Sequence, residues 1–220
     1  MFRVTLFFTA TLLLFGCKKE DAPKRDLGFD YFPLKEKMVW IYDVDSTFYD
    51  KFTGKSTNYR FQLKDSITSS FLNTVGDPVY RVERYKKNEN EQLWIYQKNF
   101  TRSIHLRSGE ETSDNLTHIK IIFPPEIYAS WNGNSRNTLD KQIYRIDNIE
   151  QGRQIGNQQY DVVDVLQIDD FNLIDEEYTL ETYAKQIGLV KKEDRQIEKN
   201  IQSGIIIHGY IYTMTLNEHR

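Results

Sequence analysis

Apolar and polar residues alternate along much of this chain, a pattern that is typical of β-strands with one packed and one wet face. Between residues 59 and 64 the odd positions are Tyr, Phe and Leu, and the even positions are Arg, Gln and Lys. An earlier strand is predicted over residues 38–49. Its first residues, Met-Val-Trp-Ile-Tyr, are apolar at odd and even positions alike, which predicts that other parts of the protein pack on both faces of the strand at that point.

The same alternation recurs to the end of the chain, and no apolar stripe of helical spacing runs longer than two turns. Further strands are predicted at residues 79–86, 93–96, 102–107, 117–123, 142–149, 159–168, 177–184, 189–197 and 205–216. The polar stretch 108–115 is interpreted as a turn, and Gly152 and Gly156 are assigned to a turn between strands. We therefore predict a mainly all-β fold: one antiparallel meander of roughly ten strands, curved into a half-barrel or barrel, with little helix.

Residues 126–138 are the least regular part of the pattern. Residues 130–135, Ser-Trp-Asn-Gly-Asn-Ser, have the composition of a loop, yet they contain Trp131. A bound ligand or partner would explain a tryptophan in a loop. A ring that folds back to plug one end of the sheet is the more common case.

The amino-terminal residues have the layout of a secretory signal. Arg3 precedes an apolar run from residue 4 to residue 15, which is shorter than the roughly 20 residues that span a bilayer. Gly16 and Cys17 follow the run. We expect residues 1–16 to be a signal peptide, residues 17–28 a lipidated cysteine and flexible tether, and residues 29–220 a single β-rich domain.

Leu14, Gly16 and Cys17 resemble the lipobox of bacterial lipoproteins. The resemblance implies cleavage before Cys17, a diacylglycerol thioether on its sulfur, and an acyl chain such as palmitate on its amine. Two or more acyl chains make a stable membrane anchor, because each buried methylene contributes roughly 0.8 kcal/mol. Cys17 is the only cysteine, so its acylation leaves no thiol for disulfides or metal ligation.

The residues after this cysteine resemble the export signal of Bacteroidetes-type lipoproteins, in which a lysine precedes an acidic pair. Lys19, Glu20 and Asp21 carry the resemblance. It implies an outer-membrane lipoprotein exposed at the cell surface. A merely solvated charged tether, with the protein on the periplasmic face of the outer membrane, is the alternative.

Residues 182–192, Thr-Tyr-Ala-Lys-Gln-Ile-Gly-Leu-Val-Lys-Lys, resemble a motif of curved-sheet envelope lipoproteins that are similar to the outer-membrane lipoprotein carrier family. The resemblance implies a strongly curved antiparallel sheet. Gly188 would let the chain turn with a positive φ angle between two strands. Gln186 stands where relatives often have a second glycine.

Composition and motifs exclude several classes of function. The formal net charge of −3 offers no basic footprint for nucleic acid. No nucleophile elbow, His-Glu-x-x-His motif or phosphate-binding glycine loop is present, so neither an enzyme nor a cofactor is predicted. The four histidines form no i, i+4 metal pair, and the acidic clusters at 164–170 and 175–177 lack the ligand spacing of a calcium loop, so no metal is predicted.

Three functions remain open. The first is a noncatalytic envelope protein that binds a lipid or other apolar ligand on the concave face of its sheet, unless the aromatics there simply fill the core. The candidate ligand-facing residues are Trp40, Tyr42, Tyr59, Phe61, Trp94, Tyr96, Trp131, Tyr210 and Tyr212. The second is an accessory subunit that binds an envelope protein partner through its outer face and the Trp131 loop. The third, with least support, is a hydrolase of envelope glycans or peptides.

Overall fold

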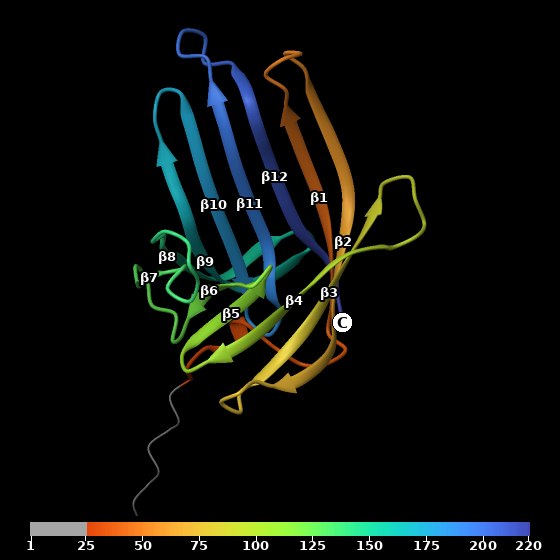
Figure 1. Cartoon of the computed structure of the whole chain (residues 1–220), viewed down its shortest axis with the longest axis vertical. Helices are drawn as coiled ribbons and strands as arrows, with labels where there is room; N and C mark the ends of the chain where they lie inside the picture. The colour runs from red at the N-terminus through yellow and green to blue at the C-terminus, as the bar shows by residue number, and fades with distance from the viewer. Residues whose placement is uncertain (1–25) are drawn as a thin grey trace, which may run out of the picture.

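The computed structural model describes residues 26–220, and these residues form one twelve-stranded antiparallel sheet. The strand order is β6-β5-β4-β3-β2-β1-β12-β11-β10-β9-β8-β7. Strands that are neighbours in sequence therefore pair, except β6 and β7, which form the two edges of the sheet, and β1 also pairs with β12. The strands are β1 Val39–Tyr49, β2 Ser56–Leu72, β3 Pro78–Asn88, β4 Ile95–His105, β5 Ser108–Ser113, β6 Leu116–Ile122, β7 Ser130–Asn132, β8 Ile143–Ile155, β9 Gln158–Phe171, β10 Asp175–Ala184, β11 Gly188–Lys199 and β12 Ile206–His219. The predicted all-β antiparallel meander is confirmed (Figure 1).

The count of roughly ten strands was too low, because two short strands carry loop-like sequence. Residues 108–115 are not simply a turn: β5, Ser108–Ser113, pairs with both β4 and β6. Residues 130–135 are not all loop, since β7, Ser130–Asn132, pairs with β8. Gly152 lies within β8 at an irregularity of register rather than in a turn, with a φ angle of 67°. In each case pairing with a neighbouring strand overrides local composition.

The sheet curls until its two edge strands meet. The Ile119 amide of β6 donates to the Gly133 carbonyl at 2.9 Å, and the Trp131 indole Nε1 of β7 donates to the Ile119 carbonyl, also at 2.9 Å. An isolated bridge between Thr117 and Arg136 continues this contact. The curved sheet is therefore nearly closed into a barrel along this seam, which we call the closure seam and define as residues 117–119 against 131–136.

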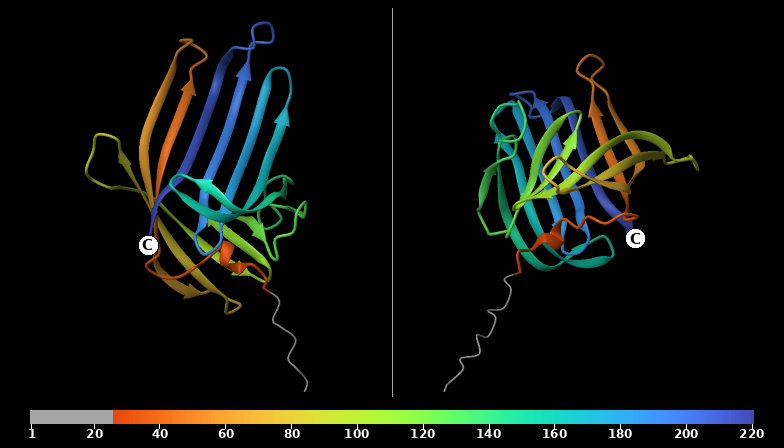
Figure 2. Two further views of the ribbon diagram at one scale, coloured as in Figure 1. Left: turned by 180° about the vertical axis from the view of Figure 1, so that it is seen from behind. Right: turned by 60° about the horizontal axis from the view of Figure 1, so that its bottom comes forward.

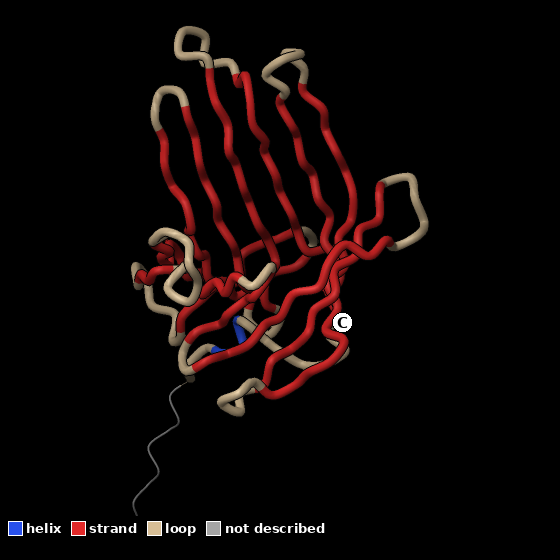
Figure 3. The backbone as a smooth tube through the Cα atoms, in the orientation of Figure 1, coloured by secondary structure: helices blue, strands red, loops and turns tan. Residues whose placement is uncertain are grey.

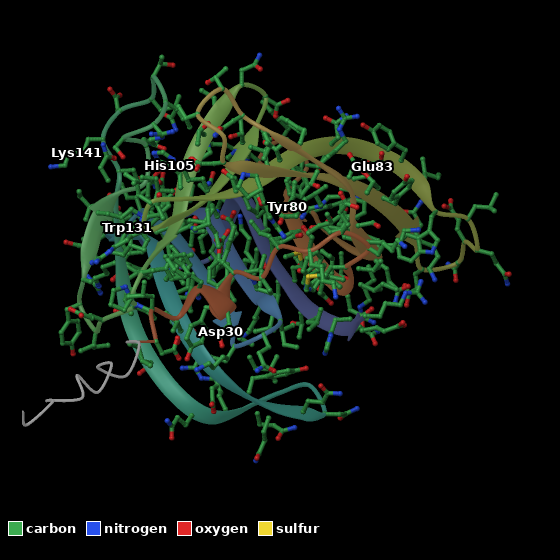
Figure 4. All side chains as sticks on the ribbon, turned by 90° about the horizontal axis from the view of Figure 1, so that it is seen from below. Asp30, Tyr80, Glu83, His105, Trp131 and Lys141 are labelled. Carbon is green, nitrogen blue, oxygen red and sulfur yellow. The ribbon has the colours of Figure 1, made fainter. Side chains whose placement is uncertain are left out.

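One end of the molecule is closed by the segment that precedes β1. The 3-10 turn η1, Phe29–Tyr31, is the sole helical element among the described residues (Figure 3). After it, Phe32 is 4% exposed, and its ring centroid lies 6.1 Å from that of Tyr183. Seen from below, the segment around Asp30 lies across the middle of the ring of strands (Figure 4). No helix within residues 26–220 is long and apolar enough to cross a membrane.

The other end is open. There β1, β2 and β9 to β12 lie side by side and extend past β3 to β6 (Figures 1 and 2). They end in the hairpin turns that join β1 to β2, β9 to β10 and β11 to β12. The inner face is identified by the buried side chains Trp40, Tyr42 and Val44 of β1, which alternate with less buried neighbours. The core therefore fills the closed half of the molecule, while the inner face of the open half stays accessible.

Candidate functional site

A chain of alternating charges crosses the inner face above the apolar core. Arg84 of β3 binds Asp65 of β2 through two hydrogen bonds of 2.6 Å, and Asp65 is fully buried. Arg102 of β4 donates from Nε to Glu111 of β5 at 2.9 Å, and its Nη2 lies 3.9 Å from Asp65. Two guanidinium groups and two carboxylates thus lie next to one another on the inner face of the sheet.

The chain of charges continues across the barrel to strands that are not sheet neighbours. Lys120 of β6 donates to Glu181 of β10 at 2.7 Å, although 61 residues separate them. Lys192 of β11 lies 3.8 Å from Glu181 and 3.7 Å from Asp194. Because β6 and β10 are far apart in the strand order, the Lys120–Glu181 pair fastens the two sides of the curved sheet together.

These side chains surround a cavity of about 270 Å³ on the inner face, which we call the ionic cavity. Its walls come from β3, β4, β5, β6, β10, β11 and β12. The lining residues are Arg84, Arg102, Glu111, Lys120, Glu181, Tyr183, Leu189, Lys192, Asp194, Tyr210, Tyr212 and Met214. Most of them are charged or carry a hydroxyl, so the cavity suits a polar group.

Two carboxylates of the ionic cavity, Glu111 and Glu181, are held in their charged form. Burial alone would raise the pKa of Glu111, but the charges of Arg102, Lys120 and Arg84 lower it to about 2. Glu181 is shifted in the same direction: burial opposes ionisation, and the nearby ammonium groups of Lys120 and Lys192 outweigh it and lower the pKa. Both groups are therefore anionic at neutral pH.

A second cavity of about 290 Å³ continues along the inner face toward the open end. Phe48, Glu177, Gln196, His208 and Tyr210 are among its lining residues, and Tyr210 also lines the ionic cavity. The rings of Phe48 and His208 meet edge to face with centroids 6.4 Å apart. The two cavities thus adjoin through Tyr210, and we call this second one the open-end cavity.

The aromatic residues predicted to face a ligand occupy five different places. Trp40 and Tyr42 lie on the inner face but are buried at 2% and 0% exposure, and their polar atoms donate to the Ile187 and Leu189 carbonyls. Tyr210 and Tyr212 line the ionic cavity. Burial raises the pKa of each of these two hydroxyls to about 12, so both remain protonated donors.

The other five candidates lie away from the ionic cavity. Tyr59 and Phe61 share the inner face of β2 with the buried Leu63, and Tyr59 is half exposed. Trp94 and Tyr96 lie on the outer face. Tyr96 pairs with Tyr85 of β3, and Tyr85 pairs with Lys64, which is on the outer face of β2. The Lys64 ammonium also lies 4.8 Å from the centre of the Trp94 ring.

Trp131 belongs to the closure seam. Its ring packs edge to face on Tyr144 with centroids 6.1 Å apart, in addition to the hydrogen bond from its indole to Ile119. This is the arrangement expected of a loop tryptophan that folds back onto the sheet. Cys17, Lys19, Glu20 and Asp21 lie outside the described residues.

Sequence reasoning missed the charged residues of the ionic cavity, although a signal was present. Asp65 falls in the same phase as Leu63 and Ile67, Arg84 in the phase of Val82, and Arg102 in the phase of Phe100. A charge in phase with buried apolar residues marks a buried ion pair or a site. Within residues 26–220, no group of three or more His, Cys, Asp or Glu side chains is arranged to hold a metal ion.

No protein-family model matches this chain, and no curated protein matches it. Among solved structures, the chain is similar to a presumed lipoprotein from Parabacteroides distasonis ATCC 8503, with a TM-score of 0.44 and 11% identity over 86% of this chain and 98% of that one. It is also similar to a presumed exported protein with a YmcC-like fold from Bacteroides fragilis NCTC 9343, with a TM-score of 0.41, 11% identity and the same coverage. Both TM-scores lie below 0.5, so neither likeness assigns this chain a function.

Proposed function

We propose that this protein is a noncatalytic, lipid-anchored envelope protein that binds an amphipathic ligand on the inner face of its curved sheet. The observation that carries the proposal is the pair of adjoining cavities. The ionic cavity offers charged groups at the closed half. The open-end cavity beside it offers the rings of Phe48 and Tyr210, together with His208 and the carboxylates of Asp175, Glu177 and Glu198. A ligand with a polar head and an apolar portion could place its head in the ionic cavity and its apolar portion against these two rings.

The structure modifies the simpler idea of a purely apolar ligand. An alkyl chain gains little from a cavity whose walls carry Arg84, Arg102, Lys120 and Lys192, because it would strip water from these charges without replacing their hydrogen bonds. Phe61 and Tyr59 further along the inner face are better placed to contact apolar atoms.

The state of the buried carboxylates supports a noncatalytic role. A glycan hydrolase needs one carboxylic acid with a raised pKa that donates a proton to the leaving group. Glu111 and Glu181 have lowered pKa values, and each is bound to a cation or hydroxyl. Neither is suited to act as a general acid at neutral pH.

The proposed location depends on the amino-terminal signals. The lipobox-like Leu14, Gly16 and Cys17 support anchoring of the protein, and Lys19, Glu20 and Asp21 support its presence at the cell surface of the outer membrane. The periplasmic face of that membrane is the alternative.

Native mass spectrometry of the protein purified from its own envelope tests the proposal. We expect a bound amphiphile, and a mature chain that begins at Cys17 and carries the added mass of acyl groups. Tyr212→Ser should lower the bound fraction, whereas Thr213→Ser, which alters the neighbouring residue on the outer face, should leave it unchanged. A uniformly ligand-free spectrum would contradict ligand binding, and an unmodified Cys17 would contradict the anchor.

A further inference from the structure

The cations of the ionic cavity have more hydrogen-bond donors than the surrounding carboxylates accept. Arg102 carries five N–H donors, yet among the described residues its side chain makes one hydrogen bond, from Nε to Glu111. Lys120 uses one of its three donors, on Glu181. Lys192 lies 3.7 Å and 3.8 Å from its nearest carboxylate oxygens, beyond hydrogen-bond distance.

The carboxylates offer fewer free positions: among the described residues, one oxygen each of Glu111 and Asp194 accepts no hydrogen bond. Both oxygens of Asp65 accept from Arg84. Glu181 accepts from Lys120 on one oxygen and from the Tyr183 hydroxyl on the other, at 2.7 Å and 2.6 Å. Asp194 accepts from the Tyr210 hydroxyl at 3.2 Å. The cavity therefore has a surplus of donors, which an additional acceptor would satisfy.

Arg102 is held rigidly in position for such an acceptor. Its side chain is 8% exposed, and its guanidinium carbon lies 5.9 Å, 5.8 Å and 5.1 Å from the ring centroids of Phe32, Trp40 and Phe100. These three rings limit where the guanidinium can move, so little conformational entropy is lost when its free N–H groups bind.

These free donors, and not a net charge of the walls, favour an anion. Four cations, Arg84, Arg102, Lys120 and Lys192, face four carboxylates, because Asp65 behind the wall binds Arg84 and the wall itself carries Glu111, Glu181 and Asp194. At about 30 Å³ per molecule, a cavity of about 270 Å³ corresponds to roughly nine water molecules, which is enough room for a phosphate or carboxylate group together with water.

We propose that the ionic cavity is an anion-binding subsite, in which Arg102, Lys120 and Lys192 receive a phosphate or carboxylate group. The inference rests on the proposed function, because it assigns the polar head of the amphipathic ligand to this cavity. The anion forms charge-assisted hydrogen bonds with the free N–H groups, and the apolar part of the ligand extends past the ring of Tyr210 to the ring of Phe48 in the open-end cavity.

Calorimetry on the full chain, purified from its own membranes in a non-ionic detergent, tests this subsite with three probes: hexyl phosphate, hexanol and inorganic phosphate. Lys192→Met is the informative variant, because Lys192 makes no hydrogen bond that the fold would lose. Lys191→Met is its matched control, since Lys191 is the next residue, forms an ion pair with Glu193 at 3.2 Å and lines a cavity on the other side of the sheet.

We expect hexyl phosphate to bind the wild-type protein, and Lys192→Met to weaken that binding by about tenfold or more, as the loss of a charge-assisted hydrogen bond implies. Lys191→Met should change it less than about twofold. If inorganic phosphate binds as tightly as hexyl phosphate, the anion is a free phosphate. If hexyl phosphate binds more tightly, the anion is the head of an amphiphile.

Three results would overturn the subsite: hexanol binding as tightly as hexyl phosphate, equal effects of the two lysine variants, or no binding of any probe. If native mass spectrometry nevertheless finds a bound amphiphile, the proposed function stands without the anion subsite. If inorganic phosphate binds in a Lys192-dependent manner while the native spectrum is empty, the subsite stands and the proposed amphipathic ligand falls.

Discussion

At the scale of single residues, position within the alternation determines the role of a charge. Asp45 and Asp65 are both aspartates in neighbouring strands, and both bind an arginine. Asp45 points outward, where its side chain is 51% exposed, and Asp65 points inward, where its exposure is 0%. The burial of each aspartate, and not the presence of an ion pair, therefore decides how much it contributes to the stability of the fold.

We expect Asp65→Asn to destabilise the fold by about 3–5 kcal/mol, because it removes the counter-charge of Arg84 and leaves Arg102 with Glu111 alone. The matched variant Asp45→Asn removes an exposed pair with Arg60 and should cost about 1 kcal/mol or less. Urea denaturation followed by tryptophan fluorescence measures both. Equal urea midpoints for the two variants would show that the buried pair contributes no more to stability than the exposed pair.

The turn before β11 shows a residue role that the sequence predicted well. Gly188 was expected to need a positive φ angle, and its φ is 91°. Gln186, which stands where relatives often have glycine, also adopts a positive φ of 66°. The turn thus keeps its geometry with one glycine, at the expense of placing a glutamine in the left-handed region.

At the scale of elements, the closure seam depends on a close approach that only glycine permits. The Gly133 carbonyl accepts from Ile119, and a Cβ at Gly133 would lie 2.5 Å from the ring of Tyr144. The same ring packs against Trp131, so a shift of Tyr144 would disturb the hydrogen bond from the Trp131 indole to Ile119 as well.

Gly133→Ala should therefore destabilise the protein by about 1–3 kcal/mol through overpacking at the seam. Ser135→Ala, in the exposed part of the same segment, should have a small effect. Hydrogen exchange provides a second measurement: the Ile119 amide should lose protection in Gly133→Ala, while the amides between β1 and β12 keep theirs. Unchanged protection at Ile119 would contradict the role assigned to Gly133.

The two short strands were missed for a common reason. β5 (Ser-Gly-Glu-Glu-Thr-Ser) and β7 (Ser-Trp-Asn) are rich in polar and turn-forming residues, and their strand conformation comes from hydrogen bonds to neighbouring strands. Most long strands were found because extended alternation outweighs local turn propensity. The exception is β4, Ile95–His105, which was predicted as two strands at 93–96 and 102–107 because the polar residues 97–99 interrupt the alternation. Trp131 gave a partial signal, since a large ring in a polar segment indicated packing without indicating its partner.

At the scale of the whole molecule, charged side chains link the two sides of the curved sheet in addition to the closure seam. Lys120 and Glu181 connect β6 to β10 across the interior, and Glu111 binds Arg102 nearby. The pKa of Glu111 is lowered from 4.5 to about 2, and that of Glu181 is lowered too. A carboxylate with a lowered pKa stabilises the folded state above its ordinary pKa and ceases to do so as the pH falls through its lowered value.

We therefore expect the urea midpoint to be steady down to about pH 5 and to fall progressively between about pH 4.5 and pH 2. Glu111→Gln should make that decline shallower, because glutamine has no proton to gain. Glu218→Gln, which changes an exposed glutamate on β12, should leave the decline as in the wild type. A decline of equal steepness in all three proteins would contradict the assignment to the ionic cavity.

The sequence by itself determined the fold class, the antiparallel order and most strand positions, because alternation of apolar residues is a local property of the chain. It also placed a charge in the buried phase at Asp65, Arg84 and Arg102. Only the tertiary structure decided that these charges meet Lys120 and Glu181 around one cavity, that Trp94 faces outward, and that Trp131 joins the two sheet edges. The reason is curvature: which residues face one another across a curled sheet depends on the twist and register accumulated over twelve strands, and no local pattern contains that sum.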